Sequence, residues 1–358
     1  MARALELARR GLYTTTPNPR VGCVLVRDTE TVNEVVGEGW HERAGEPHAE
    51  VHALRQAGVR ARGATAYVSM EPCAHQGHTP PCCVALVEAG VSRVVVAAME
   101  DPNPLVAGKG FARLRAANIV VESGLMADEA RSLNIGFVAR MTRGRPWVRV
   151  KIAASLDGKT ALLNGQSQWI TGPQARRDGH AWRAQACAIL TGIGTVKDDN
   201  PQLTVRDVET SRQPLRVVVD SRLETPLDAR VLGTGTLIAA AAHLAQPMHA
   251  LQAQGAEIIV LPNAAGKVEL CDLMLELGRR GFNEVHVEAG YKLNGSLLNE
   301  GLVDELLIYL APTVLGDAAH AMFHLPQLKT LSGQRKLNIV DVRQIGPDIR
   351  IVARVAPV

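Results

Sequence analysis

The sequence predicts an α/β protein of two domains, and three observations support this fold class. Short apolar strands alternate with helical segments along nearly the whole chain, which is typical of layered α/β sheets. The chain of 358 residues is long enough for two domains, each with its own core. A polar segment with Gly144 and Pro146 interrupts the pattern, as interdomain linkers do. We expect domains at 1–142 and 147–358, with a linker at about 143–146.

The first half is expected to contain helices that end before Gly11, Gly58 and Gly90, because glycine favours the residue after a helix. Its expected elements, in order, are helix 2–10, strands 21–26 and 35–40 as a hairpin, helix 49–57, strand 66–70, helix 82–89, strand 94–98, helix 109–117, strand 119–122 and helix 127–140. The first helix starts without an N-cap residue, so we expect a few residues to be missing before Met1.

The second half repeats the alternation of strands and helices and ends in a hairpin. Its expected elements, in order, are strand 147–154, helix 173–186, strands 188–190, 215–219, 236–240 and 257–261, helix 268–280, strand 284–287, helix 294–300, strand 305–310 and hairpin 336–355. The polar segment 141–146 before it is read as the linker.

Composition disfavours several classes of partner. The net charge of +3 and the aromatic content of 3% do not indicate a nucleic-acid surface or a base-stacking platform. No apolar run is long enough to span a membrane, and no signal peptide is recognisable. Six cysteines do not form a dense disulfide framework, so we expect a cytoplasmic protein.

A candidate metal site lies in the first half. His48 and the cysteines of two Pro-Cys steps, Cys73 and Cys82, offer three ligands and leave one tetrahedral position open, as in catalytic zinc sites. Each residue alone has an ordinary alternative, a buried thiol or a surface imidazole. Cys83 adjoins Cys82 and is an alternative ligand. We favour Cys82 because it follows Pro81 and starts a predicted helix.

Glu50 is the expected acid/base of this site, moving a proton from water to a leaving amine in hydrolytic deamination. Positions two apart do not share a face of a regular helix. His48 and Glu50 therefore converge only if His48 lies in the irregular first turn, which is a condition that a structure tests.

Two glycine-containing turns in the second half follow strands, at 191–195 and 288–296. Such turns bind phosphates, although each is by itself more often only a tight turn. Exposed polar groups are expected in loops 167–171 and 198–201. Arg183 and Arg206 could bind a substrate phosphate, but spacing alone favours ordinary surface arginines.

Motifs in both halves resemble one family, the bifunctional deaminase-reductases of riboflavin biosynthesis. They are His48–Leu54, Met70–Cys73, Gly77–Cys82, Asp101–Gly110, Ala154–Lys159 and Ser167–Thr171. The resemblance implies a cytidine-deaminase-like three-layer domain followed by a dihydrofolate-reductase-like domain. It also implies zinc-dependent deamination of a phosphoribosylamino-diaminopyrimidinone, and then NADPH-dependent reduction of the ribosyl group to ribityl.

The resemblance also assigns site residues. It places the zinc ligands at His48, Cys73 and Cys82 and the proton shuttle at Glu50, in agreement with the choice of Cys82. It places NADPH contacts at Ala153, Trp169, Thr195, Asp199, Ser221, Gly290, Tyr291, Lys292, Leu293, Asn294, Gly295 and Ser296. It places substrate contacts at Ser167, Arg183, Leu203, Arg206 and Glu288, to which we add Lys151, and in the deaminase half we expect Asn18, His78 and Thr79.

His78 is a departure, because many relatives carry Lys or Arg in this loop. If it meets the substrate phosphate, deaminase affinity should fall as pH rises through its pKa, and His78→Lys should flatten that dependence. For the reductase, Asp199 and Glu288 are the nearby ionisable groups, and neither is assigned as proton donor. The family implies homo-oligomerisation through the reductase domain.

Two alternatives compete with this assignment. One is a zinc protein that binds or edits nucleic acid, fused to an unrelated reductase-like half; near-neutral charge and scarce aromatics disfavour it. The other is that only one half is active. The presence of the family's motif residues in both halves argues against it.

Overall fold

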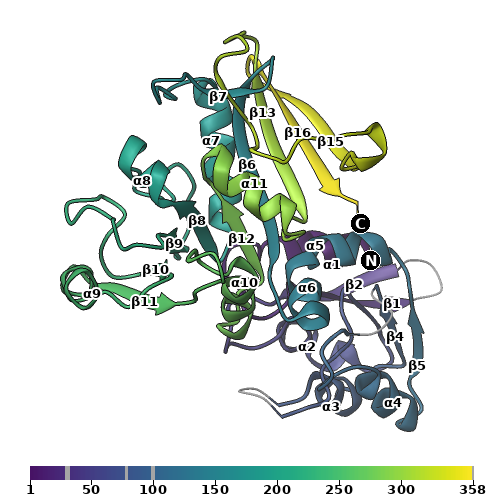
Figure 1. Cartoon of the computed structure of the whole chain (residues 1–358). Helices are drawn as coiled ribbons and strands as arrows, with labels where there is room; N and C mark the ends of the chain where they lie inside the picture. Colours follow the sequence, from purple (N-terminus) through teal and green to yellow (C-terminus); the bar gives the residue numbers. More distant parts are fainter. Residues whose placement is uncertain (29–32, 77–79, 98–100, 357–358) are drawn as a thin grey trace. The chain divides into compact units, whose positions relative to one another are not determined.

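The structure, a computed structural model, describes residues 1–28, 33–76, 80–97 and 101–356. The chain divides into two compact units, Met1–Gly144 and Arg145–Val358, each with its own sheet and core (Figure 1). Within the described ranges, no helix combines the length and apolar character needed to cross a bilayer.

Unit 1 is built on a five-stranded sheet of order β2-β1-β3-β4-β5. β1 pairs antiparallel with both β2 and β3, whereas β3, β4 and β5 run parallel. Its elements are α1 (Ala2–Arg9), β1 (Gly22–Asp28), β2 (Asn33–Trp40), α2 (Ala49–Ala57), η1 (Gly58–Ala61), β3 (Thr65–Val68), α3 (Cys82–Glu88), β4 (Arg93–Val96), α4 (Lys109–Ala116), β5 (Val120–Ser123), α5 (Ala127–Leu133) and α6 (Ile135–Arg143).

Helices cover both faces of this sheet, so the expected three layers are confirmed. Alternate strand residues such as Leu25 and Val94 pack with α2, α3 and α4 on one face. Val24 and its neighbours pack on the other face against Leu7 of α1.

Glycines on β2 bring α2 unusually close to the sheet. A Cβ on Gly37 would lie 2.2 Å from the Ala53 carbonyl oxygen, and one on Gly39 would lie 2.4 Å from that of Ala49. Only glycine permits this approach. The close packing fixes α2, and therefore its N-terminal turn, against the strands.

Unit 2 is built on a nine-stranded sheet of order β11-β10-β9-β8-β12-β6-β13-β16-β15, parallel from β11 to β13 and antiparallel beyond. Its strands are β6 (Trp147–Ser155), β7 (Lys159–Ala161), β8 (Ala188–Gly192), β9 (Leu215–Val219), β10 (Thr236–Ala240), β11 (Ala256–Val260), β12 (Glu284–Val287), β13 (Glu305–Ala311), β14 (His320–Ala321), β15 (Leu337–Ile345) and β16 (Asp348–Val355). Its helices are α7 (Pro173–Gln185), α8 (Ile193–Asp199), α9 (Ala245–Ala253), α10 (Leu270–Arg279), α11 (Tyr291–Asn299) and η2 (Leu331–Gly333).

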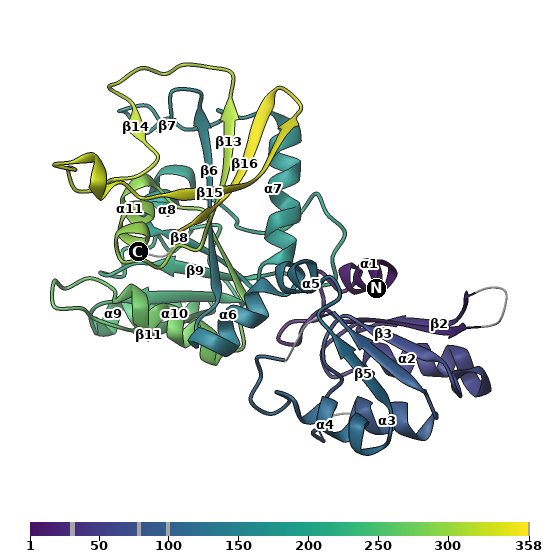
Figure 2. The ribbon, with the colours of Figure 1, turned by 90° about the vertical axis from the view of Figure 1, so that its right-hand side faces the viewer.

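In Figure 2, α7 lies on one side of strands β6 and β13, and α11 lies on the other side. The two faces of this sheet carry different side chains. One face is apolar: Val150 and Val287 pack against α10 and α11 through residues such as Leu273 and Leu297. On the other face α7 contacts β12 and β15, and strand residues there include buried charged groups such as Arg149.

The structure corrects the expected helix 127–140, which is two helices separated at Asn134. The Asn134 side chain accepts a hydrogen bond from the Arg20 backbone N–H (2.7 Å) and donates one to the Arg20 carbonyl oxygen (3.0 Å). Asn134, held by this distant segment, has non-helical backbone angles (φ −109°, ψ 21°), and one helix ends and the next begins there. The second helix, α6, continues to Arg143, so residues 141–143 of the expected linker are helical.

Two further differences concern the number and the start positions of helices in unit 2. Helices α8 and α9 were not expected, and Asp198 and Asp199 end α8 instead of lying in a loop. Helix α11 begins at Tyr291, three residues before the expected start, because Gly290 is its N-cap. The predicted hairpin at 336–355 is confirmed as β15 and β16.

Candidate active sites

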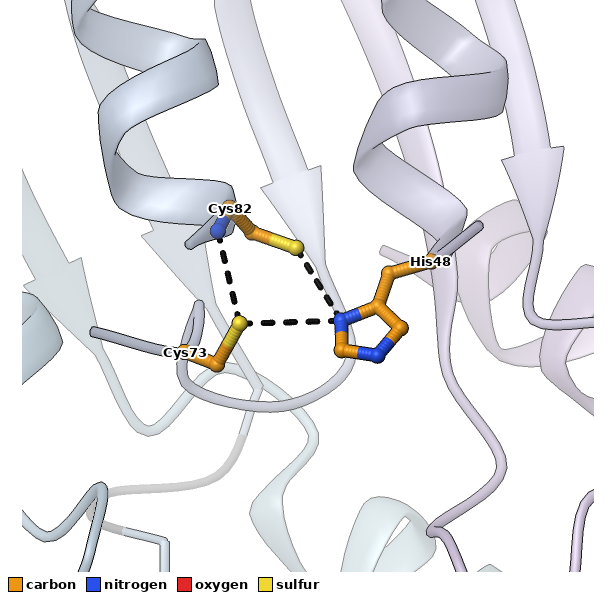
Figure 3. Close-up of side chains that lie close together, drawn as sticks. All are labelled: His48, Cys73 and Cys82. Atoms are coloured by element: carbon orange, nitrogen blue, oxygen red, sulfur yellow. Dashed lines mark hydrogen bonds between the residues drawn. The ribbon is translucent and has the colours of Figure 1, made fainter. Parts of the chain in front are cut away.

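Three side chains in unit 1 converge as potential metal ligands. One ligand atom from each of His48, Cys73 and Cys82 lies within 4.8 Å of the other two (Figure 3). His48 Nδ1 lies 3.2 Å from Cys82 Sγ and 3.6 Å from Cys73 Sγ. These are the three residues that the sequence singled out.

Local structure explains this convergence. His48 is the N-cap of α2 with extended backbone (φ −78°, ψ 166°), so it lies outside the regular helix, as the spacing to Glu50 required. Cys73 follows β3, and Cys82 is the first residue of α3, after Pro81. The Cys82 backbone N–H donates to Cys73 Sγ at 3.3 Å, which ties the loop to the helix.

The donor set suits zinc. Hydrogen bonds from Cys82 and His48 lower the pKa of the Cys73 thiol to about 4, so this sulfur is a ready thiolate ligand. One imidazole and two sulfurs leave a fourth tetrahedral position for a reacting molecule. Cys83, the alternative ligand, is fully buried among Leu86 and other core residues, so its thiol belongs to the core.

Glu50 has the environment of an acid/base group. It is only 3% exposed, and its Oε2 atom is buried with no hydrogen-bond partner among the described residues. Burial raises the pKa of Glu50. An unpartnered buried carboxylate oxygen is costly unless a ligand engages it, so it marks the open side of this site.

Asn18 reaches the same site through two histidines. Its Nδ2 atom lies 3.1 Å from His41 Nε2, and the His41 ring packs edge-on against the ring of His48 with centroids 5.1 Å apart. Burial lowers the pKa of His41 to about 4, so its ring is neutral near pH 7. The expected substrate contacts His78 and Thr79 lie outside the described residues.

The sequence reasoning did not find Glu71, which organises the loop beside the cysteines. Its carboxylate accepts hydrogen bonds from the backbone N–H groups of Asp101, Gly108, Gly110 and Phe111, at 2.9 to 3.2 Å. A carboxylate directly before Pro72-Cys73 was visible in the sequence, but its partners are 30 to 40 residues away, so no local signal identified them.

Unit 2 holds a cavity of about 1030 Å³ at the carboxyl ends of its central strands. This volume is at the upper end of the range for small-molecule sites. The expected contact residues that line it are Lys151, Ala153, Ser167, Trp169, Arg183, Thr195, Asp199, Leu203, Arg206, Glu288, Gly290, Tyr291, Lys292, Leu293 and Asn294.

A charged cluster lies in this cavity. Arg183 donates to both oxygens of Glu288, with the Nη2–Oε2 bond at 2.8 Å, and Arg183 Nη1 donates to the Thr204 carbonyl oxygen at 3.0 Å. Burial alone would raise the pKa of Glu288, but Arg183 holds it well below its usual range. Burial also lowers the pKa of Lys151, against the pull of Glu288. Arg183 is therefore an engaged site residue and not an ordinary surface arginine.

Polar residues also line the cavity of unit 2. Asp199 Oδ1 accepts hydrogen bonds from Ser167 Oγ (2.8 Å) and Gln168 Nε2 (3.3 Å). The neighbouring Trp169 is 69% exposed, and the Arg176 guanidinium lies 4.6 Å from its ring centroid. An exposed indole at a cavity rim offers a flat surface for a ring to stack on.

Two helix N-termini meet at the cavity. Gly192 is the N-cap of α8 and Gly290 that of α11, and both glycines line the cavity. Neither helix has a side-chain cap, so backbone N–H groups of both first turns are available to phosphate oxygens. Asn294 Oδ1 is buried there with no hydrogen-bond partner in the described part of the chain, although Asn294 Nδ2 donates to the Ala289 carbonyl oxygen at 3.2 Å. These groups fit a phosphorylated dinucleotide.

Three expected cofactor contacts do not line the cavity. Ser221 Oγ accepts a hydrogen bond from the Val268 backbone N–H at 3.2 Å. Gly295 packs against the chain at His324, whose carbonyl oxygen would lie 2.0 Å from an added Cβ. Ser296, next on α11, is also not among the lining residues.

Sequence reasoning also missed some cavity residues. Thr160, Arg176 and Arg230 line it, but they come from three separate segments without a common motif. Only the folded chain brings them together.

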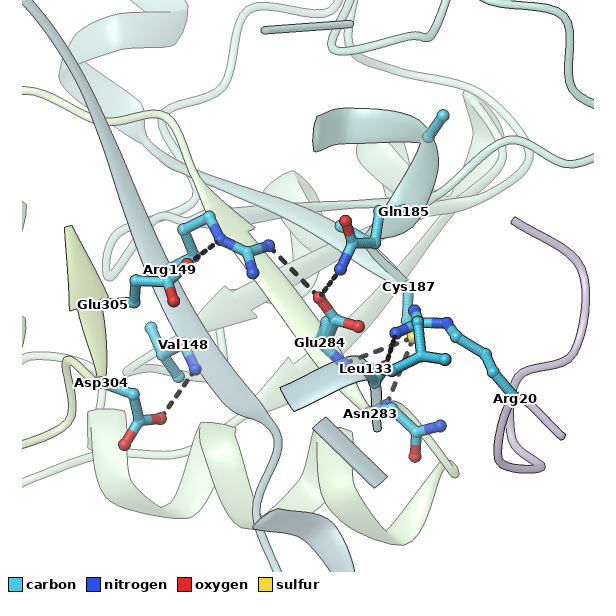
Figure 4. A network of polar contacts seen from close by, with 12 residues as sticks. Arg20, Leu133, Val148, Arg149, Gln185, Cys187, Asn283, Glu284, Asp304 and Glu305 are labelled. Carbon is cyan, nitrogen blue, oxygen red and sulfur yellow. Dashed lines mark hydrogen bonds and ion pairs between the residues drawn. The ribbon is translucent and has the colours of Figure 1, made fainter. Parts of the chain in front are cut away.

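On the sheet face covered by α7, buried charges continue away from the cavity (Figure 4). Arg149 contacts Glu305 and Glu284, the latter at 3.2 Å, and Gln185 Nε2 donates to Glu284 Oε2 at 2.8 Å. The Trp182 ring lies 4.4 Å from the Arg149 guanidinium. The buried Arg149 guanidinium is therefore paired with two carboxylates and an aromatic ring, and such partners offset the cost of burying a charge.

Comparisons with known proteins match each half of the chain to a known domain. Residues 1–98 match the cytidine and deoxycytidylate deaminase zinc-binding region, and residues 146–351 match the RibD C-terminal domain. The chain is 50% identical over 362 residues to riboflavin biosynthesis protein RibD of Escherichia coli (strain K12), covering 98% of this chain and 96% of that protein. It is 45% identical to the RibD of Haemophilus influenzae, covering 98% and 95%.

Solved structures show the same architecture. Acinetobacter baumannii RibD, form 1, has a TM-score of 0.90 at 45% identity, covering 99% of this chain and 98% of that one. A Thermotoga maritima diaminohydroxyphosphoribosylaminopyrimidine deaminase/5-amino-6-(5-phosphoribosylamino)uracil reductase has a TM-score of 0.86 at 32% identity, covering 99% and 97%.

Proposed function

The chain belongs to the RibD family of riboflavin-biosynthesis proteins and is a bifunctional deaminase and reductase, and from this membership we propose which residues carry each reaction. The observation that carries the proposal is the cluster of His48, Cys73 and Cys82 with the unpartnered carboxylate of Glu50. The full-length match disfavours a nucleic-acid-editing deaminase fused to an unrelated domain.

The first proposed reaction is hydrolytic deamination of 2,5-diamino-6-ribosylamino-4(3H)-pyrimidinone 5′-phosphate. Zinc, when bound by His48, Cys73 and Cys82, supplies the Lewis acidity that makes water a nucleophile at neutral pH. Glu50 takes one proton from the attacking water at its Oε2 atom and gives it to the ring nitrogen. It then moves the second proton, from the hydroxyl added to the ring carbon, to the amine, which leaves as ammonia when the C–N bond breaks. Asn18 holds the pyrimidine, its amide being oriented by His41.

The second proposed reaction reduces 5-amino-6-(5-phosphoribosylamino)uracil to the ribitylamino product. NADPH, when bound at the N-termini of α8 and α11, supplies the hydride. Arg183 and Arg206 bind the phosphorylated substrate, and Glu288, which Arg183 keeps ionised, accepts hydrogen bonds from it. We assign the proton donor to Lys151, because its ammonium lies in the cavity with a lowered pKa, whereas Glu288 carries no proton to give.

We further propose that residues 1–142 form the deaminase domain and residues 147–358 the reductase domain. The matched spans, 1–98 and 146–351, support this division. A cytoplasmic location is proposed from the six free thiols, which a reducing compartment maintains. The small net charge of +3 favours small phosphorylated substrates over nucleic acid.

Self-association of the reductase domain is proposed from β15. This strand is at the end of the nine-stranded sheet, so one edge of its backbone is unpaired in the single chain. Ile339 is 67% exposed and Val342 56% exposed on it. A second copy that covers this strand would remove both features from water.

The proposal is tested by separating the two activities. Glu50→Gln should abolish ammonia release from the diaminopyrimidinone phosphate while zinc content and NADPH consumption with the deaminated substrate stay at wild-type levels. Glu288→Gln should abolish NADPH consumption with the deaminated substrate, while ammonia release and zinc content stay at wild-type levels. Wild-type ammonia release by the Glu50 variant, or loss of its zinc, would overturn the assignment of Glu50.

A further inference from the structure

His286 is a buried histidine beside the reductase cavity with no role in the proposed reactions so far. It lies on β12, two residues before Glu288, and its side chain is 0% exposed. Neither ring nitrogen has a hydrogen-bond partner among the described residues. Fully buried imidazoles almost always have at least one partner, so this side chain requires an explanation.

The register of the sheet places His286 among the charges of the cavity. His286 pairs with Arg149 of the parallel neighbour β6, so both side chains point to the face covered by α7. Lys151 is two residues farther on β6 and therefore shares this face. Val287 points to the opposite, apolar face and packs in its core.

The charged groups that face His286 come from three elements. Glu284 and Glu288 flank it along its own chain segment, Arg149 and Lys151 lie on β6, and Arg183 reaches in from α7; the partner on β8 is the apolar Ile189. Burial lowers the pKa of His286; Glu288 favours the protonated ring, but Arg149 and Arg183 oppose it and the pKa stays below its usual value. The ring is thus neutral and carries one N–H.

One carboxylate oxygen is within reach of that N–H. His286 Nε2 lies 3.4 Å from Glu288 Oε1, the same oxygen to which Arg183 Nε donates. The contact is long while Arg183 holds Glu288. Contacts of this kind tighten when ligands rearrange a site.

We propose that His286 is a positioning residue of the reductase, whose Nε2–H takes over Glu288 Oε1 when Arg183 turns to the phosphorylated substrate. The proposal rests on the assignment of Arg183 and Glu288 as substrate contacts made above. A neutral donor keeps Glu288 ionised and fixed beside Lys151 without adding a third cation to Lys151 and Arg183. Without His286, the Glu288 carboxylate released by Arg183 would lack the buried hydrogen-bond donor that replaces the guanidinium.

The chain allows a matched pair of variants. His286→Gln places an amide N–H near the position of Nε2 and should retain most of the reductase activity. His286→Asn ends near the position of Nδ1, cannot reach Glu288, and should lower the reductase kcat at least about tenfold, because hydrogen bonds to charged groups contribute about 1.5–3 kcal/mol. KM for NADPH should be unchanged in both variants.

The pH profile separates this role from a structural one. Loss of a hydrogen bond to a carboxylate raises its pKa. The acid limb of the reductase kcat/KM profile should therefore move to higher pH in His286→Asn and stay in place in His286→Gln. NADPH affinity from fluorescence and the deaminase activity of the same preparation serve as controls for folding.

Three outcomes count against the proposal, and they are distinguishable. A wild-type kcat and pH profile in His286→Asn, with an inactive Glu288→Gln, overturns the role of His286 alone. Full reductase activity in Glu288→Gln overturns the assignment of Glu288 and this proposal with it. Equal loss of NADPH binding in both His286 variants shows that His286 only maintains the fold.

Discussion

At the residue scale, Cys82 and Cys83 are chemically identical neighbours with opposite surroundings. Cys82 starts α3, and its sulfur faces His48 and Cys73. Cys83 points into the core beside Leu86. Because successive residues at a helix start point in different directions, only one of the two thiols reaches the metal-ligand cluster.

We therefore expect Cys82→Ser to lose zinc, measured as metal per chain, together with ammonia release. Cys83→Ser should keep its zinc but lose about 1–3 kcal/mol of stability, because it buries a hydroxyl in an apolar core. The reverse pattern of zinc retention would show that Cys83 is the ligand.

His41 makes the stability of the protein sensitive to acid. Its pKa is about 4 in the folded protein and near 6.5 in an unfolded chain. Between these values the unfolded chain takes up a proton that the folded protein does not. The contribution of His41 is therefore complete above pH 6.5 and is lost as pH falls toward 4, by about 3 kcal/mol.

His41→Gln should remove this dependence, since glutamine does not titrate and its oxygen can accept the hydrogen bond from Asn18. The free energies of unfolding of wild type and variant are compared in denaturant at pH 7 and pH 4.5, both zinc-loaded. The free energy of unfolding of the variant, relative to that of wild type, should be higher at pH 4.5 than at pH 7. A difference independent of pH contradicts the neutral, buried state of His41.

At the element scale, Glu71 joins the cysteine loop to the start of α4. One carboxylate accepts four backbone N–H groups between Asp101 and Phe111. Gly110 completes the junction, because a Cβ there would lie 2.0 Å from the Pro72 carbonyl oxygen. The loop that carries Cys73 is therefore fixed by a segment about 30 residues later in the chain.

Glu71→Gln replaces one acceptor oxygen by a donor that faces backbone N–H groups. We expect a loss of about 2 kcal/mol in unfolding free energy and faster amide hydrogen exchange at Gly108, Gly110 and Phe111. Glu88→Gln, at an exposed position on α3, is the control and should change stability by less than about 0.5 kcal/mol. Unchanged exchange at the three amides would refute the anchoring role.

At the scale of the whole molecule, each unit contains one site, and each site lies where its own sheet and helix termini meet. The potential zinc ligands are the N-cap residue of α2, the first residue of α3 and a residue of the loop after β3. The reductase cavity uses the starts of α8 and α11. The exposed edge strand β15 belongs to neither site, and it is the surface from which we propose self-association.

Val342→Lys places a charge on this strand and should shift the mass of the protein in solution, measured by light scattering, toward that of a single chain. Val59→Lys is the matched control, because Val59 is 94% exposed in unit 1 and should leave the mass unchanged. An unchanged mass in Val342→Lys, with an oligomeric wild type, would show that another surface holds the copies together.

Local patterns in the sequence predict much of the fold and of the deaminase centre. Most of the strands, the final hairpin and the placement of His48 outside the regular helix follow from hydrophobic periodicity and from glycine and proline signals, which act between near neighbours. The zinc residues were predicted for the same reason, because their spacing is short and their chemistry specific. The short strands β7 and β14 were not predicted. The division of helix 127–140 was not predicted, since Asn134 bonds to Arg20, far earlier in the chain.

The sequence by itself therefore determined the fold class, the two-domain character and the residue types of the deaminase centre. Only the tertiary structure decided that Cys83 is a core residue, that Glu71 anchors a distant loop, and that Arg183 pairs with Glu288. It alone placed His286 beside that pair. The physical reason is that periodicity and capping are local properties of the chain, whereas burial and charge pairing depend on which distant segments meet.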